Sequence, residues 1–355
     1  MHQKLVSQKF NRLQSQDDII VLGIETSCDE TAVAVVKNGR QVLSNVIYSQ
    51  IPIHRKFGGV VPEVASRNHL LKINSVVDKA VKDAKLKLSD IDAVAVTHGQ
   101  GLLGALLVGV SAAKTLAYSL QIPLIKVNHI QSHICANFIE HQNLEPPFLA
   151  IVASGGHTAI VKVESYTDYK VLGGTEDDAI GEAFDKVARL LGLPYPGGPE
   201  IDKLAKMGKP AIEFYKNPKG INKALRLSYS GLKSAVANYI NKANMKNEKI
   251  NVADVCASFS KQAVDTLVKS AVFAAKSEDV NSIVLAGGVA ANSYLREKLT
   301  IDCATQNIMV FIPPMSLCTD NGAMVASRAY FSITTGNDIA DLTLNARANL
   351  PLSET

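Results

Sequence analysis

Two similar segments of the chain, about 130 residues apart, constrain its fold most strongly. Each consists of two apolar, β-branched runs around a short polar turn, which is the pattern of two neighbouring strands. The runs are 19–25 and 31–37 in the first segment and 148–153 and 158–163 in the second. Asn38-Gly39 follows the first segment and predicts a further tight turn. On this pattern alone, two ordinary hairpins would be preferred. Together with the glycine motif at 283–292, described below, the repetition favours two duplicated α/β lobes whose turns could each face a nucleotide phosphate.

Length and composition favour two lobes and a soluble globular protein. The chain has 355 residues, of which 47% are hydrophobic and 20% are charged, so it can bury a large core. Its most apolar stretch, residues 101–113, is too short to span a bilayer and ends at Lys114. We therefore expect no membrane association.

The cysteines indicate a reducing compartment, because they are odd in number and include no Cys-x-x-Cys pair. The five are Cys28, Cys135, Cys256, Cys303 and Cys318. We therefore expect the cytoplasm. Residues 1–16 contain no acidic side chain, which leaves a mitochondrial or plastid targeting segment as an alternative.

A histidine pair predicts a metal site. His129 and His133 are four residues apart, and Asn128 is a suitable N-cap, so both rings would lie on one face of a helix. Ile130 stands where a zinc protease helix carries Glu, which disfavours that chemistry. Asp320 precedes a second helical segment, where it is either an N-cap or a third ligand. Two histidines and one carboxylate would suit Fe(II) or Zn(II) with open positions, while histidines packed for shape are the alternative.

A glycine motif after an apolar run predicts a nucleoside site. The apolar run 283–286 leads into Gly287-Gly288 and then into a helix that we expect from about residue 293. Glycines at a strand end let a ligand approach the backbone, and a helix N-terminus offers N–H groups to an anion or a ribose. The motif is not Gly-x-Gly-x-x-Gly, so it does not support a dinucleotide site. Asn292 is therefore a candidate nucleoside contact.

Nine ordered blocks between residues 21 and 329 closely resemble the tRNA N6-adenosine threonylcarbamoyltransferase family, the TsaD-like enzymes. The blocks are 23–31, His54 with 58–67, His129-x-x-x-His133, 154–158, 181–189, 195–199, 228–233, 287–292 and 318–321. The resemblance implies a two-lobed α/β fold like that of actin, hexokinase and Hsp70. It implies a flexible extension at 1–18, a first lobe at 19–140 completed by 316–345, and a second lobe at 145–315 with a helical basic insert near 175–265.

The resemblance also implies the chemistry. The family transfers a threonylcarbamoyl group from threonylcarbamoyl-adenylate to N6 of the adenosine 3′ of the anticodon, in tRNAs that read codons beginning with A. It implies one divalent metal ion, with Fe(II) ahead of Zn(II) and Mn(II), on His129, His133 and Asp320. The implied substrate-binding residues are Val152, Ala153, Ser154, Gly155, Gly156, Asp185, Gly198, Asp202 and Asn292. Asp29 and Glu30 would handle the proton lost from the adenine amine unless they are only turn acids, and Lys233 is a further catalytic candidate.

A basic segment supports tRNA as a partner. Residues 203–233 contain eight cations and the single acid Glu213, with aromatic residues interleaved, although a solvated helical face is the alternative. The cations are Lys203, Lys206, Lys209, Lys216, Lys219, Lys223, Arg226 and Lys233. Val152 stands where archaeal and eukaryotic relatives carry Tyr, so the chain is more similar to the bacterial branch, which implies a TsaB-like paralogue and a TsaE-like ATPase as partners. A nucleotide-binding scaffold and a small-molecule kinase of the same fold are the alternative functions.

Overall fold

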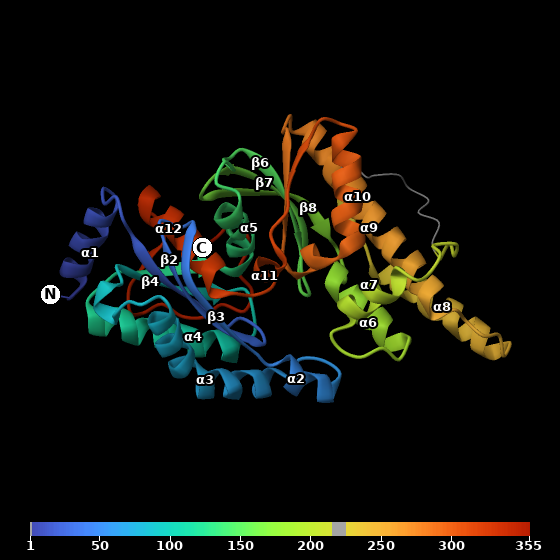
Figure 1. The fold of residues 1–355 in the computed structure, drawn as a ribbon, viewed down its shortest axis with the longest axis horizontal. Helices are drawn as coiled ribbons and strands as arrows, with labels where there is room; N and C mark the ends of the chain where they lie inside the picture. The colour runs from blue at the N-terminus through green and yellow to red at the C-terminus, as the bar shows by residue number, and fades with distance from the viewer. Residues whose placement is uncertain (1, 215–224) are drawn as a thin grey trace. The chain divides into compact units, whose positions relative to one another are not determined.

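The computed structural model describes residues 2–214 and 225–355, which form two compact units (Figure 1). Unit 1 contains Met1–Pro146, Glu164–Tyr169 and Pro313–Thr355. Unit 2 contains Pro147–Val163 and Lys170–Ile312. Each unit has a mixed α/β architecture around one six-stranded sheet.

Unit 1 is built on a sheet with the strand order β12-β5-β4-β1-β2-β3. Strands β1, β2 and β3 pair antiparallel, whereas β4 and β5 add in parallel beside β1. Its elements are α1 (His2–Leu13), β1 (Ile20–Glu25), β2 (Glu30–Lys37), β3 (Gln41–Ser49), α2 (Ile51–His54), η1 (Arg55–Phe57), α3 (Pro62–Asp83), η2 (Leu88–Asp90), β4 (Ala93–Gly99), α4 (Leu103–Leu120), β5 (Leu124–Asn128), α5 (His129–Glu140), α11 (Met315–Cys318), α12 (Gly322–Thr335) and β12 (Ile339–Ala340).

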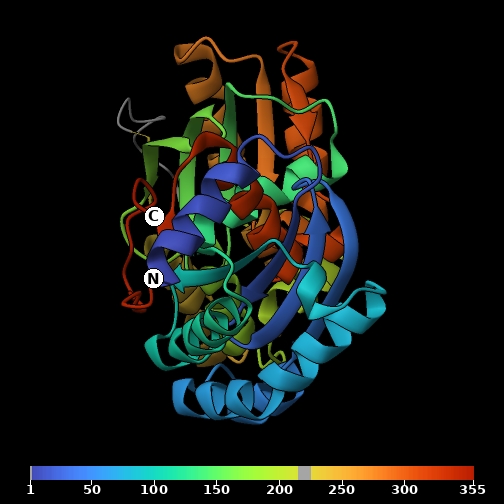
Figure 2. The same ribbon diagram turned by 90° about the vertical axis from the view of Figure 1, so that its left-hand side faces the viewer.

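Alternating side chains of the unit 1 sheet form two separate cores. Leu22 and Ile24 of β1 pack with α3 and α4, while Val21 packs with α12. Figure 2 shows the sheet with its covering helices from the side. Strands β1 and β2 are buried on both faces, which explains why their sequences are continuous apolar, β-branched runs.

The predicted turns and strands of the first segment are confirmed. Residues 38–40 connect β2 to β3, and Asn38 and Gly39 both have positive φ, 53° and 67°, at the centre of a turn that Arg40 N closes by donating to Lys37 O at 3.3 Å. The helix predicted from Asn128 is also present, and the Asn128 side chain accepts hydrogen bonds from the backbone N–H groups of Ile130 and Gln131.

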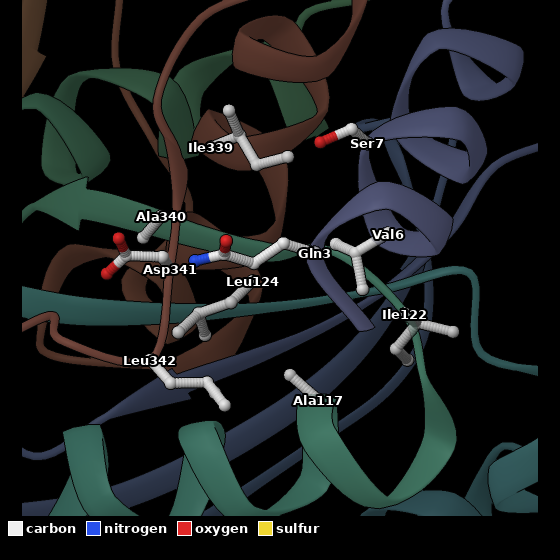
Figure 3. A pocket seen from close by; sticks show the side chains of 10 residues that line it. All are labelled: Gln3, Val6, Ser7, Ala117, Ile122, Leu124, Ile339, Ala340, Asp341 and Leu342. Carbon is white, nitrogen blue, oxygen red and sulfur yellow. The ribbon is translucent and has the colours of Figure 1, made fainter. Parts of the chain in front are cut away.

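The N-terminal segment differs from the flexible extension expected at 1–18, because residues 2–13 form helix α1. Val6, Phe10 and Leu13 follow at helical spacing and are buried, and Phe10 and Leu13 belong to the core beneath α12. Figure 3 shows Gln3, Val6 and Ser7 of α1 lining one side of a cavity of about 310 Å³, with Ile339 and Ala340 of β12 on another.

The sequence predicted that the apolar stretch 101–113 ends at Lys114. Helix α4 continues past this residue to Leu120. Its 18 residues make it the one helix in 2–214 and 225–355 that is long and apolar enough to cross a bilayer, and 33% of it is buried. The helix packs against α3 and β4 of unit 1, and Lys114 Nζ donates to Leu344 O at 3.0 Å. A core helix passes the same test of length and composition, so α4 is weak evidence for a membrane span.

Unit 2 repeats this topology in a second sheet with the order β11-β10-β6-β7-β8-β9. Strands β6 and β7 pair antiparallel, and β10 and β11 add in parallel beside β6, as β4 and β5 do beside β1. The predicted duplication is therefore present. The elements are β6 (Phe148–Ala153), β7 (Thr158–Ser165), β8 (Asp168–Thr175), α6 (Ile180–Leu190), α7 (Gly197–Ala205), β9 (Arg226–Leu227), α8 (Ser230–Met245), α9 (Val252–Ser277), β10 (Ser282–Ala286), η3 (Gly288–Ala291), α10 (Ser293–Ala304) and β11 (Met309–Phe311).

Candidate functional site

Unit 1 brings together the three predicted metal ligands. His129 and His133 lie on one face of α5, and their rings meet edge to face with centroids 4.7 Å apart. Asp320 comes from the loop between α11 and α12. Its Oδ1 is 3.1 Å from His133 Nε2 and 3.6 Å from His129 Nε2, and one ligand atom from each residue lies within 4.8 Å of the others.

This geometry fits a shared cation. His133 is only 1% exposed, yet its Nδ1 makes no hydrogen bond within the described residues and its Nε2 has only the Asp320 carboxylate beside it, at 3.1 Å. Buried polar atoms without hydrogen bonds are rare and require an explanation. Nitrogen and oxygen ligands at about 2.1 Å from one ion lie about 3.0–3.5 Å apart, which is close to the separations from Asp320. The donor set therefore suits a divalent transition metal.

Two glycines allow the Asp320 loop to reach the end of β1. A Cβ on Gly23 would lie 2.4 Å from Gly322 O, so β1 and the start of α12 approach more closely than side chains permit. Asn321, rather than Asp320, is the N-cap of α12, since its Oδ1 accepts from Met324 N at 3.0 Å. The N-cap alternative for Asp320 is thus excluded.

The sequence interpretation missed Glu25, which contacts the first histidine. Its Oε2 lies 3.1 Å from His129 Nδ1. Burial alone lowers the pKa of His129, but the carboxylates of Glu25 and Asp320 outweigh burial and raise it to about 9. Burial opposes ionisation of Glu25, whereas the charge and hydrogen bond of His129 lower its pKa. An acidic residue at the end of the otherwise apolar run 19–25 was the signal that could have identified it.

The acidic pair lies in the same region of unit 1. Asp29 and Glu30 occupy the turn from β1 into β2, and Ser49 Oγ donates to Glu30 Oε1 at 3.0 Å. Burial, followed by the charges of Asp29 and Asp320, raises the pKa of Glu30 to about 10. The Asp320 contribution shows that the acidic pair and the metal ligands share one electrostatic environment.

Within unit 2, the predicted adenylate residues lie on segments that contact one another. Val152 and Ala153 are buried at the end of β6, and the Ser154 turn follows them. Ser154 O accepts from Gly181 N at the start of α6, at 3.2 Å. Asp185, one turn further along α6, accepts from Gly197 N at the start of α7 through its Oδ1 at 2.7 Å.

The contacts continue from α7 back to β6. Asp202 Oδ1 accepts from the backbone N and the Oγ of Ser293, at 3.1 and 2.8 Å, at the start of α10. Asn292 is the N-cap of that helix and accepts from Leu295 N through its side chain. A Cβ on Gly287 would lie 2.5 Å from Ala153 O, so the ends of β10 and β6 are in close contact. These segments therefore form a closed ring of contacts at one edge of the sheet.

Three glycines of this ring are not required by the fold. A Cβ on Gly155, Gly156 or Gly198 would meet no atom within 4 Å, and none of them has a positive φ. Neither packing nor backbone conformation explains these glycines. The open space at all three leaves room for a ligand against the backbone.

Comparison with known proteins identifies the family. The sequence model of tRNA N6-adenosine threonylcarbamoyltransferase matches residues 41–327. The chain belongs to this family. A relative with that name from Clostridium perfringens is 57% identical, over 95% of this chain and 99% of the relative. Another from Clostridium botulinum is 55% identical, over 96% of this chain and 99% of the relative.

Solved structures confirm the predicted fold. HypF from T. kodakarensis has a TM-score of 0.61 and 16% identity, over 90% of this chain and 48% of HypF. Component A of (R)-2-hydroxyglutaryl-CoA dehydratase from Acidaminococcus fermentans has a TM-score of 0.54 and 14% identity, over 89% of this chain and 99% of that protein. At these identities the likeness concerns the fold alone, which is the two-lobed architecture of actin, hexokinase and Hsp70.

The basic segment of this family member is less positive than its sequence suggests. Lys216, Lys219 and Lys223 lie outside the described residues. Acids from outside the segment pair with three of the others: Asp202 with Lys206 at 3.3 Å, Glu176 with Arg226 at 3.1 Å and Asp178 with Lys233 at 2.8 Å. Asp178 also pairs with Lys186 at 2.7 Å. The fold thus places Lys233 in an ionic network at the start of α8.

Proposed function

We propose that this chain transfers a threonylcarbamoyl group from threonylcarbamoyl-adenylate to N6 of the adenosine 3′ of the anticodon, in tRNAs that read codons beginning with A. Membership of the family supports the reaction class. The observation that carries the proposal is the cluster of His129, His133 and Asp320, because a non-catalytic nucleotide scaffold would not need two buried imidazoles that converge on one carboxylate.

His129, His133 and Asp320 would hold one divalent ion through two Nε2 atoms and a carboxylate oxygen. Fe(II) is our first choice, with Zn(II) and Mn(II) as the other ions that suit mixed nitrogen and oxygen ligands. When bound, such an ion supplies a Lewis acid that stabilises negative charge developing on the substrate.

The ring of contacts in unit 2 would hold the adenylate. Backbone N–H groups of Ser154, Gly155 and Gly156 would face its phosphate, because the exposed turn has open space at both glycines. Asp185 and Asp202 carry acceptor oxygens suited to ribose hydroxyls. Asn292 uses its Oδ1 as a helix cap, so its Nδ2 would be the group that contacts the nucleoside.

In the reaction, N6 of adenosine forms a bond to the carbamoyl carbon, and the bond from that carbon to the phosphate oxygen breaks. AMP leaves with the bonding electrons, and the attacking amine loses one proton. Asp29 and Glu30 would handle that proton from their shared turn in unit 1. Asp29 would accept it, because the raised pKa of Glu30 keeps that second carboxyl protonated near neutral pH. Lys233 would approach the substrate from α8, with Asp178 fixing its Nζ.

The tRNA would bind on unit 2. The side chains of Lys203 and Lys209 are exposed and form no ion pair with an acid among the described residues, in contrast to the three paired cations, so they are our first choice for phosphate contacts. Such contacts would add affinity that falls with salt and does not depend on base sequence.

A TsaB-like paralogue and a TsaE-like ATPase would support turnover in the cytoplasm. An apolar groove of about 800 Å³ between α3 and α4 supports a protein partner on unit 1, since Leu70 at its edge is 68% exposed. We assign this groove to the paralogue. The five free cysteines, four of them buried, agree with a reducing compartment.

A reconstituted reaction tests the proposal. The purified chain is incubated with unmodified tRNA, threonine, bicarbonate, ATP and a threonylcarbamoyl-adenylate synthase, with and without the two partners. Nucleosides are then analysed by mass spectrometry. We expect threonylcarbamoyladenosine from the wild type and from Gln142→Ala, an exposed change just after α5. We expect at least about a 100-fold loss in His133→Ala.

Other outcomes would contradict the transferase. Tight nucleotide binding without any modified nucleoside, under every partner combination, would indicate a scaffold. ATP consumption that phosphorylates a small molecule would indicate a kinase.

A further inference from the structure

We infer that Glu25 is a positioning residue for the metal site, which holds the His129 ring so that its Nε2 lone pair faces His133 and Asp320. This inference rests on the proposed metal site. The Glu25 carboxylate lies 3.1 Å from His129 Nδ1 and is fully buried. A histidine that binds metal through one nitrogen commonly donates its other N–H to a carboxylate, which fixes the tautomer and the ring plane.

Two hydrogen-bond donors, one on β4 and one just after β1, fix the Glu25 carboxylate itself. Thr97 Oγ1 on β4 donates to Oε2 at 2.5 Å. Ser27 N, just after β1, donates to Oε1 at 2.6 Å. The carboxylate is therefore held between neighbouring strands before it contacts His129, which is what an orienting group requires.

The burial of Glu25 needs a reason beyond packing. Taking a carboxylate out of water is costly unless it is paired and hydrogen-bonded, and its ionic partner among the described residues is His129. The other buried side chains of β1, those of Val21, Leu22 and Ile24, are apolar. An apolar residue at this strand end would fill the space without that cost, so the carboxylate is explained by what it does to the imidazole.

A carboxylate determines the tautomer in a way that the nearby hydroxyl does not. Ser27 Oγ is also close to His129 Nδ1, at 3.2 Å, but a hydroxyl can donate or accept. A carboxylate oxygen only accepts, so the neutral, metal-binding form of the His129 ring keeps its proton on Nδ1 and its lone pair on Nε2. His133 Nδ1, the corresponding atom of the second histidine, has no hydrogen-bond partner among the described residues. The inference thus assigns the ordered tautomer to His129 alone.

The first test measures metal affinity in the full-length chain. Zn(II) binding is measured by competition with a chromogenic chelator for the wild type, Glu25→Gln and Ser27→Ala. We expect Glu25→Gln to weaken binding by about 10- to 100-fold, since its amide can present either a donor or an acceptor to Nδ1. We expect Ser27→Ala to change it by less than about 3-fold. AMP affinity, a property of unit 2, should stay unchanged in both variants.

The second test needs no folded variant of Glu25. Long-range ¹H–¹⁵N spectra of wild-type protein labelled with ¹⁵N-histidine and loaded with Zn(II) report which ring nitrogen carries the proton, and His129→Asn assigns the signal. A proton on Nδ1 is expected. A proton on Nε2, or wild-type affinity in Glu25→Gln, would overturn the role of Glu25 while leaving the metal site intact. Absence of Zn(II) binding in the wild type would overturn both.

Discussion

At the scale of single residues, Asp177 shows how one carboxylate fixes the start of a helix. Its oxygens accept from the hydroxyls of Ser228 and Ser230 and from the backbone N–H groups of Tyr229 and Ser230, at 2.5 to 3.1 Å. Burial opposes ionisation of Asp177, but the serine and backbone hydrogen bonds lower its pKa to about 2. The residue therefore anchors the first turn of α8, which carries Lys233.

This lowered pKa predicts a pH-dependent stability. A folded-state pKa below the unfolded value near 4 gives a stabilisation that is present above about pH 4 and is lost as the pH falls toward 2. We expect Asp177→Asn to lower the free energy of unfolding by about 1 kcal/mol at pH 7, a modest value because the carboxylate is exposed. Urea unfolding at pH 7, 5 and 3 should show this difference shrinking with acidity. Asp168→Asn, an exposed control, should show no such change with pH. A loss of unfolding free energy in Asp177→Asn that is constant with pH would contradict the role of the ionised Asp177 carboxylate.

At the scale of elements, helix α3 holds the turn that carries the acidic pair. His69 lies on α3, and its Nδ1 is 2.8 Å from Thr31 Oγ1 while its Nε2 is 2.9 Å from Cys28 O. A carbonyl only accepts, so Nε2 carries the proton and Nδ1 accepts from the threonine hydroxyl. The His69 ring thus contacts the residues on both sides of Asp29 and Glu30.

Replacing His69 should loosen this turn. We expect His69→Leu to lower the free energy of unfolding by about 2 to 4 kcal/mol, because the fully buried Thr31 hydroxyl and the Cys28 carbonyl lose their partner. The rate of transfer should fall through kcat and not through KM for the adenylate, since the residues proposed to bind the adenylate lie in unit 2. Thermal unfolding and steady-state kinetics check both effects. Leu71→Ser, at a side chain 75% exposed on the same helix, is the control, and a His69→Leu enzyme with wild-type kcat would exclude the positioning role.

Local signals predicted the elements that depend on nearby residues. The N-cap Asn128 and the Asn38-Gly39 turn act within a few residues, so the sequence reveals them directly. Helix α1 differs, because its stability depends on burying Phe10 and Leu13 against distant strands. Its short and otherwise polar sequence concealed that face.

At the scale of the whole molecule, the repeated strand pattern predicted both sheets, and residue types and family resemblance selected three proposed metal ligands, which lie together in unit 1. Contacts between distant segments were not accessible in the same way. Glu25 is 104 residues from His129. Asp178 and Glu176 reach the basic segment only after folding, so a count of charges along the sequence overstated its net charge.

The proposed metal ligands belong to unit 1 and the proposed adenylate residues belong to unit 2, so binding of metal and of nucleotide should be lost independently. Gly156→Val places a side chain in open space on unit 2, where a ligand would approach, and should weaken AMP binding more than about 10-fold while metal content stays at one ion. His133→Ala should do the reverse, because all three metal ligands belong to unit 1. Calorimetry with AMP and elemental analysis measure the two properties, and Lys170→Val, exposed on β8, should alter neither. Both site variants should fail in tRNA modification. If Gly156→Val released the metal, or His133→Ala abolished AMP binding, the two ligands would depend on one another and the assignment of each ligand to one unit would be wrong.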